Sequence, residues 1–180
     1  FQRNLLDIDP GRHKVTLSPS AVADLMIYFL WSAAARDAAE GRNAFANPKG
    51  GTRVGEQLSS RNISMVTDPH APGIEAIDHV VALGSSAFST AFDTGLPISK
   101  SHIITNGTLT ALGSSRHAAQ TANLPFTPLS ENLMFSDATG AGSLDQLAAR
   151  MGDGLLITCL WYIREVDPQN LLLTGLTRDG

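Results

Sequence analysis

The 180-residue chain is 43% hydrophobic and 17% charged, which suits one globular domain with a sizeable core. Its formal net charge of −4 and its lack of any Lys/Arg cluster argue against a nucleic-acid partner. The single cysteine, Cys159, excludes an internal disulfide framework and fits a reducing compartment, and no signal peptide is visible, so we expect a cytoplasmic protein.

Residues 1–13 are mixed in character and contain Asp9-Pro10-Gly11, a combination typical of a turn or linker. The chain begins without Met and ends directly after an apolar run. We therefore expect a fragment of a longer protein, in which residues 1–13 are a linker from a missing N-terminal domain.

The first regular elements are predicted to be a short strand and a long helix. Val15 and Leu17 indicate the strand, Ser18 can cap the helix, and Pro19 takes the first helical position, where its missing N–H costs nothing. The helix is expected to run to about Glu40. It is apolar on nearly every side over residues 25–35, so we expect other elements to surround it. That run is too short for a membrane span, which needs about 20 residues, and we expect no membrane partner.

Beyond the helix, turn signals separate short apolar runs. Asn106-Gly107 stands between two β-prone runs, which predicts a type I′ hairpin over residues 103–112. Ser143 can cap a helix that reaches about Met151. The other expected elements are strands at 63–67, 79–83, 132–135, 155–163 (buried on both faces) and 171–176, and a helix at 116–123. The predicted fold class is α+β: a mostly antiparallel twisted sheet wrapped around a buried apolar helix.

No residue pattern forms a recognisable catalytic or metal site. No two of the five histidines are three or four residues apart, so no helix can present two of them as metal ligands. Cys159 has no C-x-x-C partner, and its apolar surroundings favour a buried structural thiol. Ser114 lies close to His117 in sequence, but no G-x-S-x-G motif is present. Asp24 is expected in an exposed first helical turn, with an internal ion pair as the alternative.

One segment has two possible interpretations. Gly51, Thr52, Arg53, Gly55 and Glu56 belong to a Gly-x-x-x-Gly-Glu pattern in which the glycines let the backbone approach a neighbour closely. The functional interpretation is a strand that holds an extended peptide by main-chain pairing, which makes these five residues candidate substrate-binding residues. The other interpretation is a plain turn into a sheet, and it is favoured because glycines mark turns by default.

Several segments, in chain order, resemble the C-terminal domain of the TldD/PmbA family of metallopeptidase-like proteins, which are also described as modulators of DNA gyrase. They are residues 15–40 (strand and central helix), 51–58 (the Gly-x-x-x-Gly-Glu turn), 63–69, 92–97, 103–112 (the Asn-Gly hairpin), 132–133, 154–161 and 166–180. The resemblance implies that residues 14–180 form part of such a C-terminal domain.

One departure from the family pattern determines the role that the resemblance implies. Zinc-bearing members carry His-Glu-x-x-x-His on the central helix, and their Glu acts on a zinc-bound water. Residues 23–30 of this chain read Ala-Asp-Leu-Met-Ile-Tyr-Phe-Leu and contain no His. The family's further ligand Cys lies later in the domain than Cys159, so that role is not transferred. The chain therefore resembles the zinc-less PmbA (TldE-like) branch, which implies no cofactor in this chain and zinc only in a partner subunit.

Three functional hypotheses remain open. In the first, the chain is the non-zinc subunit of a heteromeric peptidase that acts on unfolded peptides, and its partner is a zinc-bearing TldD-like relative. A homodimer is the alternative assembly. In the second, it is a self-sufficient peptidase with an atypical site, formed either by the region of Ser114 and His117 or by ligands from the missing segments. In the third, it is a non-catalytic binding or assembly module that dimerises through its sheet.

Overall fold

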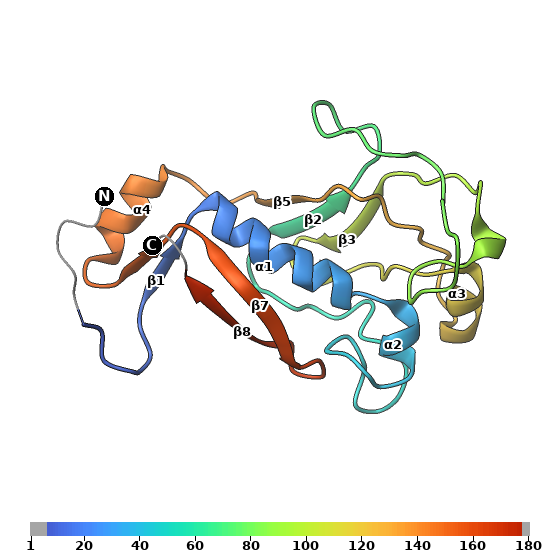
Figure 1. Ribbon diagram of the computed structural model, residues 1–180, viewed down its shortest axis with the longest axis horizontal. Coiled ribbons are helices and arrows are strands. Elements are labelled where there is room, and N and C mark those ends of the chain that lie inside the picture. Colours follow the sequence, from blue (N-terminus) through green and yellow to red (C-terminus); the bar gives the residue numbers. More distant parts are fainter. Residues whose placement is uncertain (1–6, 178–180) are drawn as a thin grey trace.

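A computed structural model describes residues 7–177 and confirms the predicted α+β class (Figure 1). The strands form three separate sheets instead of one. β1 (Val15–Leu17) pairs in parallel with β6 (Leu155–Ile157), and all the other pairings are antiparallel. The four-stranded sheet has the order β4-β3-β2-β5, and β7 and β8 form a hairpin. Their bounds are β2 Ile63–Thr67, β3 Ser101–Thr105, β4 Thr108–Leu109, β5 Met134–Asp137, β7 Leu160–Asp167 and β8 Leu172–Thr177.

The predicted long helix is wrong at its C-terminal end. α1 (Pro19–Ser32) begins as expected, because the Ser18 hydroxyl accepts the backbone N–H of Ala21 at 3.2 Å. The chain then leaves the helix and re-enters it as α2 (Ala35–Ala39). Two contacts from distant residues account for the break. The backbone of Gly113 bonds to the Ala33 carbonyl and the Ala35 N–H at 2.9 and 2.8 Å. The Asn43 side-chain amide also donates to the Ser32 carbonyl, at 2.8 Å.

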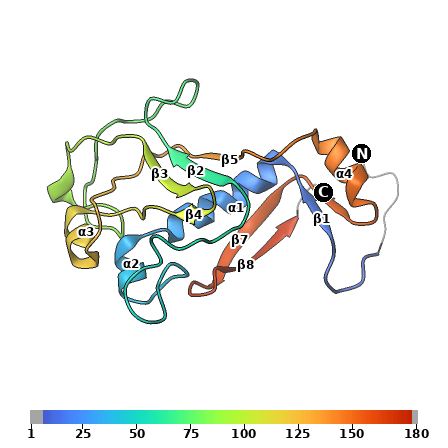
Figure 2. The same ribbon diagram turned by 180° about the vertical axis from the view of Figure 1, so that it is seen from behind.

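α1 is far less buried than predicted. Only Ala21 is buried among its residues, whereas Ile27 is 42% exposed and Trp31 is 58% exposed. The helix lies between the four-stranded sheet and the β7–β8 hairpin (Figures 1 and 2). Asp24 is not in the first turn, and its carboxylate accepts the Leu160 N–H at 3.0 Å. The Tyr28 hydroxyl donates to the Ile163 carbonyl at 2.7 Å, so polar side chains of α1 satisfy backbone groups of β7.

The main hydrophobic core lies on the four-stranded sheet, and Met26, Phe29 and Leu30 of α1 pack against it. Its buried residues come from the α2 segment, the following loop and the sheet: Ala33, Ala35, Ala38, Phe45, Met65, Ile103, Ile104, Leu109 and Leu112. Figure 2 shows α2 and α3 (Arg116–Ala122) at this end of the molecule, and α4 (Leu144–Met151) beside β1 at the other. Among the described residues, Ile27 and Trp31 of α1 lie outside this core and stay partly exposed.

Two predicted strands are wrong. Residues 79–83 form no strand, and His79 makes a single bridge to Pro97. Pro97 has no N–H for a ladder, which limits the pairing of this segment. Residues 155–163 form two strands separated at Thr158 and Cys159, where the Ser18 hydroxyl donates to the Thr158 carbonyl at 2.7 Å. This stretch is not buried on both faces, since Trp161 is 48% exposed, and Cys159 is only partly buried.

The local turn and capping predictions are confirmed. Asn106 and Gly107 both have positive φ, 49° and 81°, as a type I′ hairpin requires. Ser143 caps α4 through a reciprocal capping box with Gln146. α3 also appears where predicted, whereas β5 begins two residues later than expected. Residues 1–6 of the predicted linker lie outside the described residues. None of the helices that the structure describes is both long and apolar enough to cross a bilayer.

Candidate functional site

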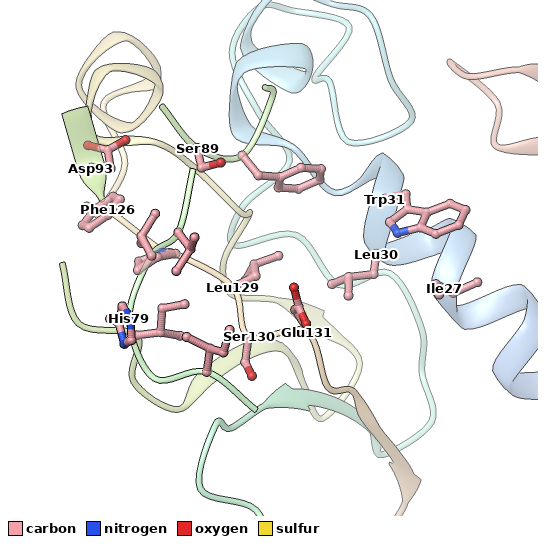
Figure 3. A pocket seen from close by; sticks show the side chains of 16 residues that line it. Ile27, Leu30, Trp31, His79, Ser89, Asp93, Phe126, Leu129, Ser130 and Glu131 are labelled. Atoms are coloured by element: carbon pink, nitrogen blue, oxygen red, sulfur yellow. The ribbon is translucent and has the colours of Figure 1, made fainter. Parts of the chain in front are cut away.

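The exposed side of α1 borders a pocket of about 430 Å³ (Figure 3). Ile27, Leu30 and Trp31 of α1 form one wall. The opposite wall comes from two irregular segments, residues 77–98 and 126–131, and Figure 3 places Phe126 and Leu129 there. The lining is mostly apolar, so the pocket can take up a hydrophobic or aromatic group.

A second pocket, of about 640 Å³, continues along the N-terminal part of the same helix. α1, β5 and α4 enclose it with apolar side chains: Val22, Met26, Leu133, Phe135, Leu144 and Leu147. The two pockets share Ile27, Leu30 and Glu131. They therefore adjoin, and we call them together the α1 groove. The α1 groove runs along an apolar face of the helix. From the sequence we expected other elements of the fold to cover this face.

An Asn side chain fixes the segment that forms the outer wall of the α1 groove. The Asn132 amide donates to the carbonyls of Asp68 and Ile74 at 2.6 and 2.7 Å, and its oxygen accepts the Asp68 N–H at 3.0 Å. These three hydrogen bonds join the end of the 126–131 segment to the first residues of the connection between β2 and β3. The sequence predicts Asn132 as the first residue of a strand, and no local pattern marks the three hydrogen bonds of its side chain.

An ion pair anchors the far end of the first pocket. Asp93 is only 2% exposed, and the Arg116 Nε donates to its carboxylate at 2.8 Å. Burial raises the pKa of Asp93, but hydrogen bonds from Arg116 and Thr90 outweigh it and hold the pKa below its ordinary value. Arg116 also donates to the Phe92 carbonyl at 2.5 Å, which ties this loop to α3. The pair spans 23 residues and was not predicted.

Two further polar side chains of the groove are not committed to a partner among residues 7–177. Ser130 is 2% exposed, and its hydroxyl has no hydrogen-bond partner there. The Glu131 carboxylate is exposed and makes neither a hydrogen bond nor an ion pair within the described chain. In Figure 3, Glu131 lies between Leu129 and Leu30. A charged group is thus available beside an apolar surface.

The five predicted substrate-binding residues lie elsewhere, beside β4. Arg53 forms a two-bond ion pair with Glu56 at 2.7 and 3.0 Å. Hydrogen bonding to Arg53 lowers the pKa of Glu56 below its ordinary value. The Gly55 N–H donates to the Leu109 carbonyl at 2.8 Å, and the Glu56 carbonyl accepts from Leu109 at 3.0 Å.

The backbone of this segment is therefore already used within the domain. Gly51 and Gly55 have positive φ, 77° and 92°, as turn residues do. None of Gly51, Thr52, Arg53, Gly55 and Glu56 lines the α1 groove. Their binding of peptide stays a prediction.

Ser114 and His117 are placed differently from a nucleophile and its base. Ser114 is fully buried, and its hydroxyl accepts the backbone N–H of Thr127 at 3.0 Å. His117 lies exposed on α3. A nucleophile must reach both its base and a substrate carbonyl, and a buried, occupied hydroxyl does neither.

The side chains of α1 do not fit a zinc site. Zinc in proteins takes three or four ligands from Cys, His and carboxylates. Asp24 is the one carboxylate of this helix, and it already accepts the Leu160 N–H. Between residues 7 and 177, no three His, Cys, Asp or Glu side chains come together as a possible metal site.

The chain matches a protein-family model and resembles several solved structures. Residues 10–180 match the model described as PmbA/TldA metallopeptidase C-terminal domain. A candidate modulator of DNA gyrase from Bacteroides thetaiotaomicron is 16% identical, with a TM-score of 0.65 over 96% of this chain and 39% of that one. A second candidate modulator, from Thermotoga maritima, is 20% identical, with a TM-score of 0.62 over 85% and 33% of the two chains.

TldE from Thermococcus kodakarensis is 19% identical, with a TM-score of 0.56 over 82% of this chain and 35% of that one. At these identities the likeness concerns the fold alone. The matched region covers between 33% and 39% of the length of these three larger chains. No curated protein matches this sequence significantly.

Proposed function

Because this chain belongs to the PmbA/TldD metallopeptidase family, we propose that it is the peptide-holding, non-zinc part of a peptidase of that family. In this proposal the α1 groove binds an extended segment of an unfolded peptide. A zinc-bearing relative supplies the metal, which activates water and polarises the scissile carbonyl. This chain binds the peptide, orients it and keeps water away from the apolar side chains it covers.

The observation that carries the proposal is the character of the helix α1. It presents Ile27, Leu30 and Trp31 to an open groove, at the helix where the resemblance places the metal ligands of zinc-bearing members. An apolar helix face beside a groove can bind a substrate by hydrophobic contact, but it supplies no catalytic group. Trp31 is 58% exposed and is suited to anchor a peptide, because Trp is enriched among the few residues that contribute most of the binding energy of an interface.

A reconstitution experiment tests both halves of the proposal. The full-length protein is purified alone and together with its zinc-bearing relative, and metal content, native mass and cleavage of a fluorogenic unfolded peptide are measured. We expect cleavage only from the pair. Stoichiometric zinc and cleavage by the protein alone would overturn the division of roles, and a homodimer indifferent to the relative would favour an assembly module.

Trp31→Ala tests the groove itself. Peptide affinity of the full-length protein is expected to fall about tenfold, because the variant removes the largest apolar group of the wall. Leu83→Ala is the matched control, since Leu83 is a fully exposed apolar residue that lines neither pocket. Equal affinity of Trp31→Ala and the control would remove the groove from the proposal.

A further inference from the structure

Glu131 occupies a special position in the α1 groove. It lines both adjoining pockets together with Ile27 and Leu30, so it stands where the two meet. It also borders a shallower hollow formed with residues 74–77. A ligand that runs along the groove from one pocket into the other passes this carboxylate.

The charge of Glu131 is not balanced by its neighbours in the groove. Within residues 7–177, no Lys or Arg lines either pocket. The other carboxylate of the first pocket, Asp93, is already paired with Arg116 at 2.8 Å. The remaining ionisable group, His79, lies beside Asp78, with its ring nitrogen 3.0 Å from that carboxylate. Among the described residues, Glu131 thus places an unpaired negative charge on a mostly apolar surface.

From this arrangement we propose that Glu131 selects a basic side chain, Lys or Arg, flanked by apolar residues in the bound peptide. The inference rests on the proposed peptide-binding role of the groove and names its specificity. Lys and Arg fit because their alkyl stems lie against apolar walls while the cationic head reaches a charge. Trp31 and Phe126 add aromatic surfaces to the same pocket, and aromatic faces attract cations.

A peptide series tests this selection in the full-length protein. Three labelled peptides share one unfolded apolar sequence and differ at one central position, which is Lys, norleucine or Glu. All are N-acetylated and C-amidated, so the side chain is the sole varied charge. Fluorescence anisotropy is measured with wild type, Glu131→Gln and Asp153→Asn. The last variant removes one exposed carboxylate that lines neither pocket.

We expect wild type and Asp153→Asn to bind the Lys peptide about fivefold more tightly than the norleucine peptide, and the Glu peptide most weakly. This factor is the upper end of what an exposed ion pair contributes. Glu131→Gln should bind the Lys and norleucine peptides equally, with unchanged affinity for norleucine. The Lys preference of wild type should shrink in 1 M salt, because added ions screen exposed charges.

The outcomes separate this inference from the proposed function. If all three peptides bind equally well and Glu131→Gln changes nothing, the selection by Glu131 is refuted while the peptide-binding role stands. If no peptide binds to wild type with or without the zinc-bearing relative, the proposed function fails with it. A Lys preference that Asp153→Asn reduces as much as Glu131→Gln does would refute the assignment to Glu131, because it would show a general charge effect.

Discussion

The clamp made by Asn132 is predicted to control both stability and the groove wall. Asn132→Ala removes three hydrogen bonds of 2.6, 2.7 and 3.0 Å to the backbone of Asp68 and Ile74. A typical intramolecular hydrogen bond contributes about 1 kcal/mol. Because this side chain is only partly buried, water will replace part of that contribution, and we expect a loss of about 2 kcal/mol in total. For a domain of this size, that loss lowers Tm by about 4–8 °C.

The assay combines chemical denaturation with hydrogen exchange. Denaturation of Asn132→Ala should show the lower free energy of unfolding with an unchanged denaturant dependence. Backbone amides between Asp68 and Ala76 should lose protection more than those of β2 and β3, because the clamp acts locally. Asn62→Ala is the matched control, since the Asn62 side chain is exposed. If Asn132→Ala changes stability by less than about 0.5 kcal/mol and leaves the loop amides protected, the clamp does not have this role.

Two further predictions concern acid stability and the central hairpin. Hydrogen bonds from the Thr139 side chain and backbone, followed by Arg61, lower the pKa of Asp137 from 3.8 to about 2. Its stabilising effect is present above about pH 4 and is lost as pH falls from 4 to 2, so Asp137→Asn should flatten the stability profile of that window in acid denaturation. Gly107→Ala should destabilise the fold by about 2 kcal/mol or more in urea, because the added Cβ would lie 2.1 Å from a backbone carbonyl oxygen at φ 81°, whereas Asn106→Gly should be nearly neutral. An unaffected Gly107→Ala variant would contradict the close approach.

Features that depend on nearby residues could be predicted from the sequence. Ser18 and Pro19 begin α1, Asn106 and Gly107 turn the hairpin, and Ser143 caps α4, all as expected. In each case the stabilising contact joins residues at most a few positions apart. The family resemblance likewise predicted the match that residues 10–180 show, because it used the order of these local signals.

Features that depend on distant contacts could not be predicted in this way. α1 ends early because Gly113 binds backbone groups at Ala33 and Ala35, about 80 positions away in sequence. The sequence predicts that Asp24 interacts with the dipole at the start of its helix. In the structure its carboxylate instead accepts the N–H of Leu160, 136 positions away in β7. Nothing in the periodicity of a helix identifies such partners, since tertiary contacts override local preference.

The α1 groove also depends on distant contacts that no local sequence pattern identifies. The apolar run of residues 25–35 predicts a helix whose surface is covered. Hydrophobic periodicity does not show whether other elements of the protein or a bound ligand cover it. In the structure the core forms at α2 and the four-stranded sheet, and Trp31 remains 58% exposed in the pocket that Glu131 also lines. An apolar helix face that the domain leaves open, with one unbalanced carboxylate beside it, is better suited to recognising a chain than to stabilising the fold. In the proposed function, the helix therefore keeps its place in the family fold while its exposed apolar face binds a peptide.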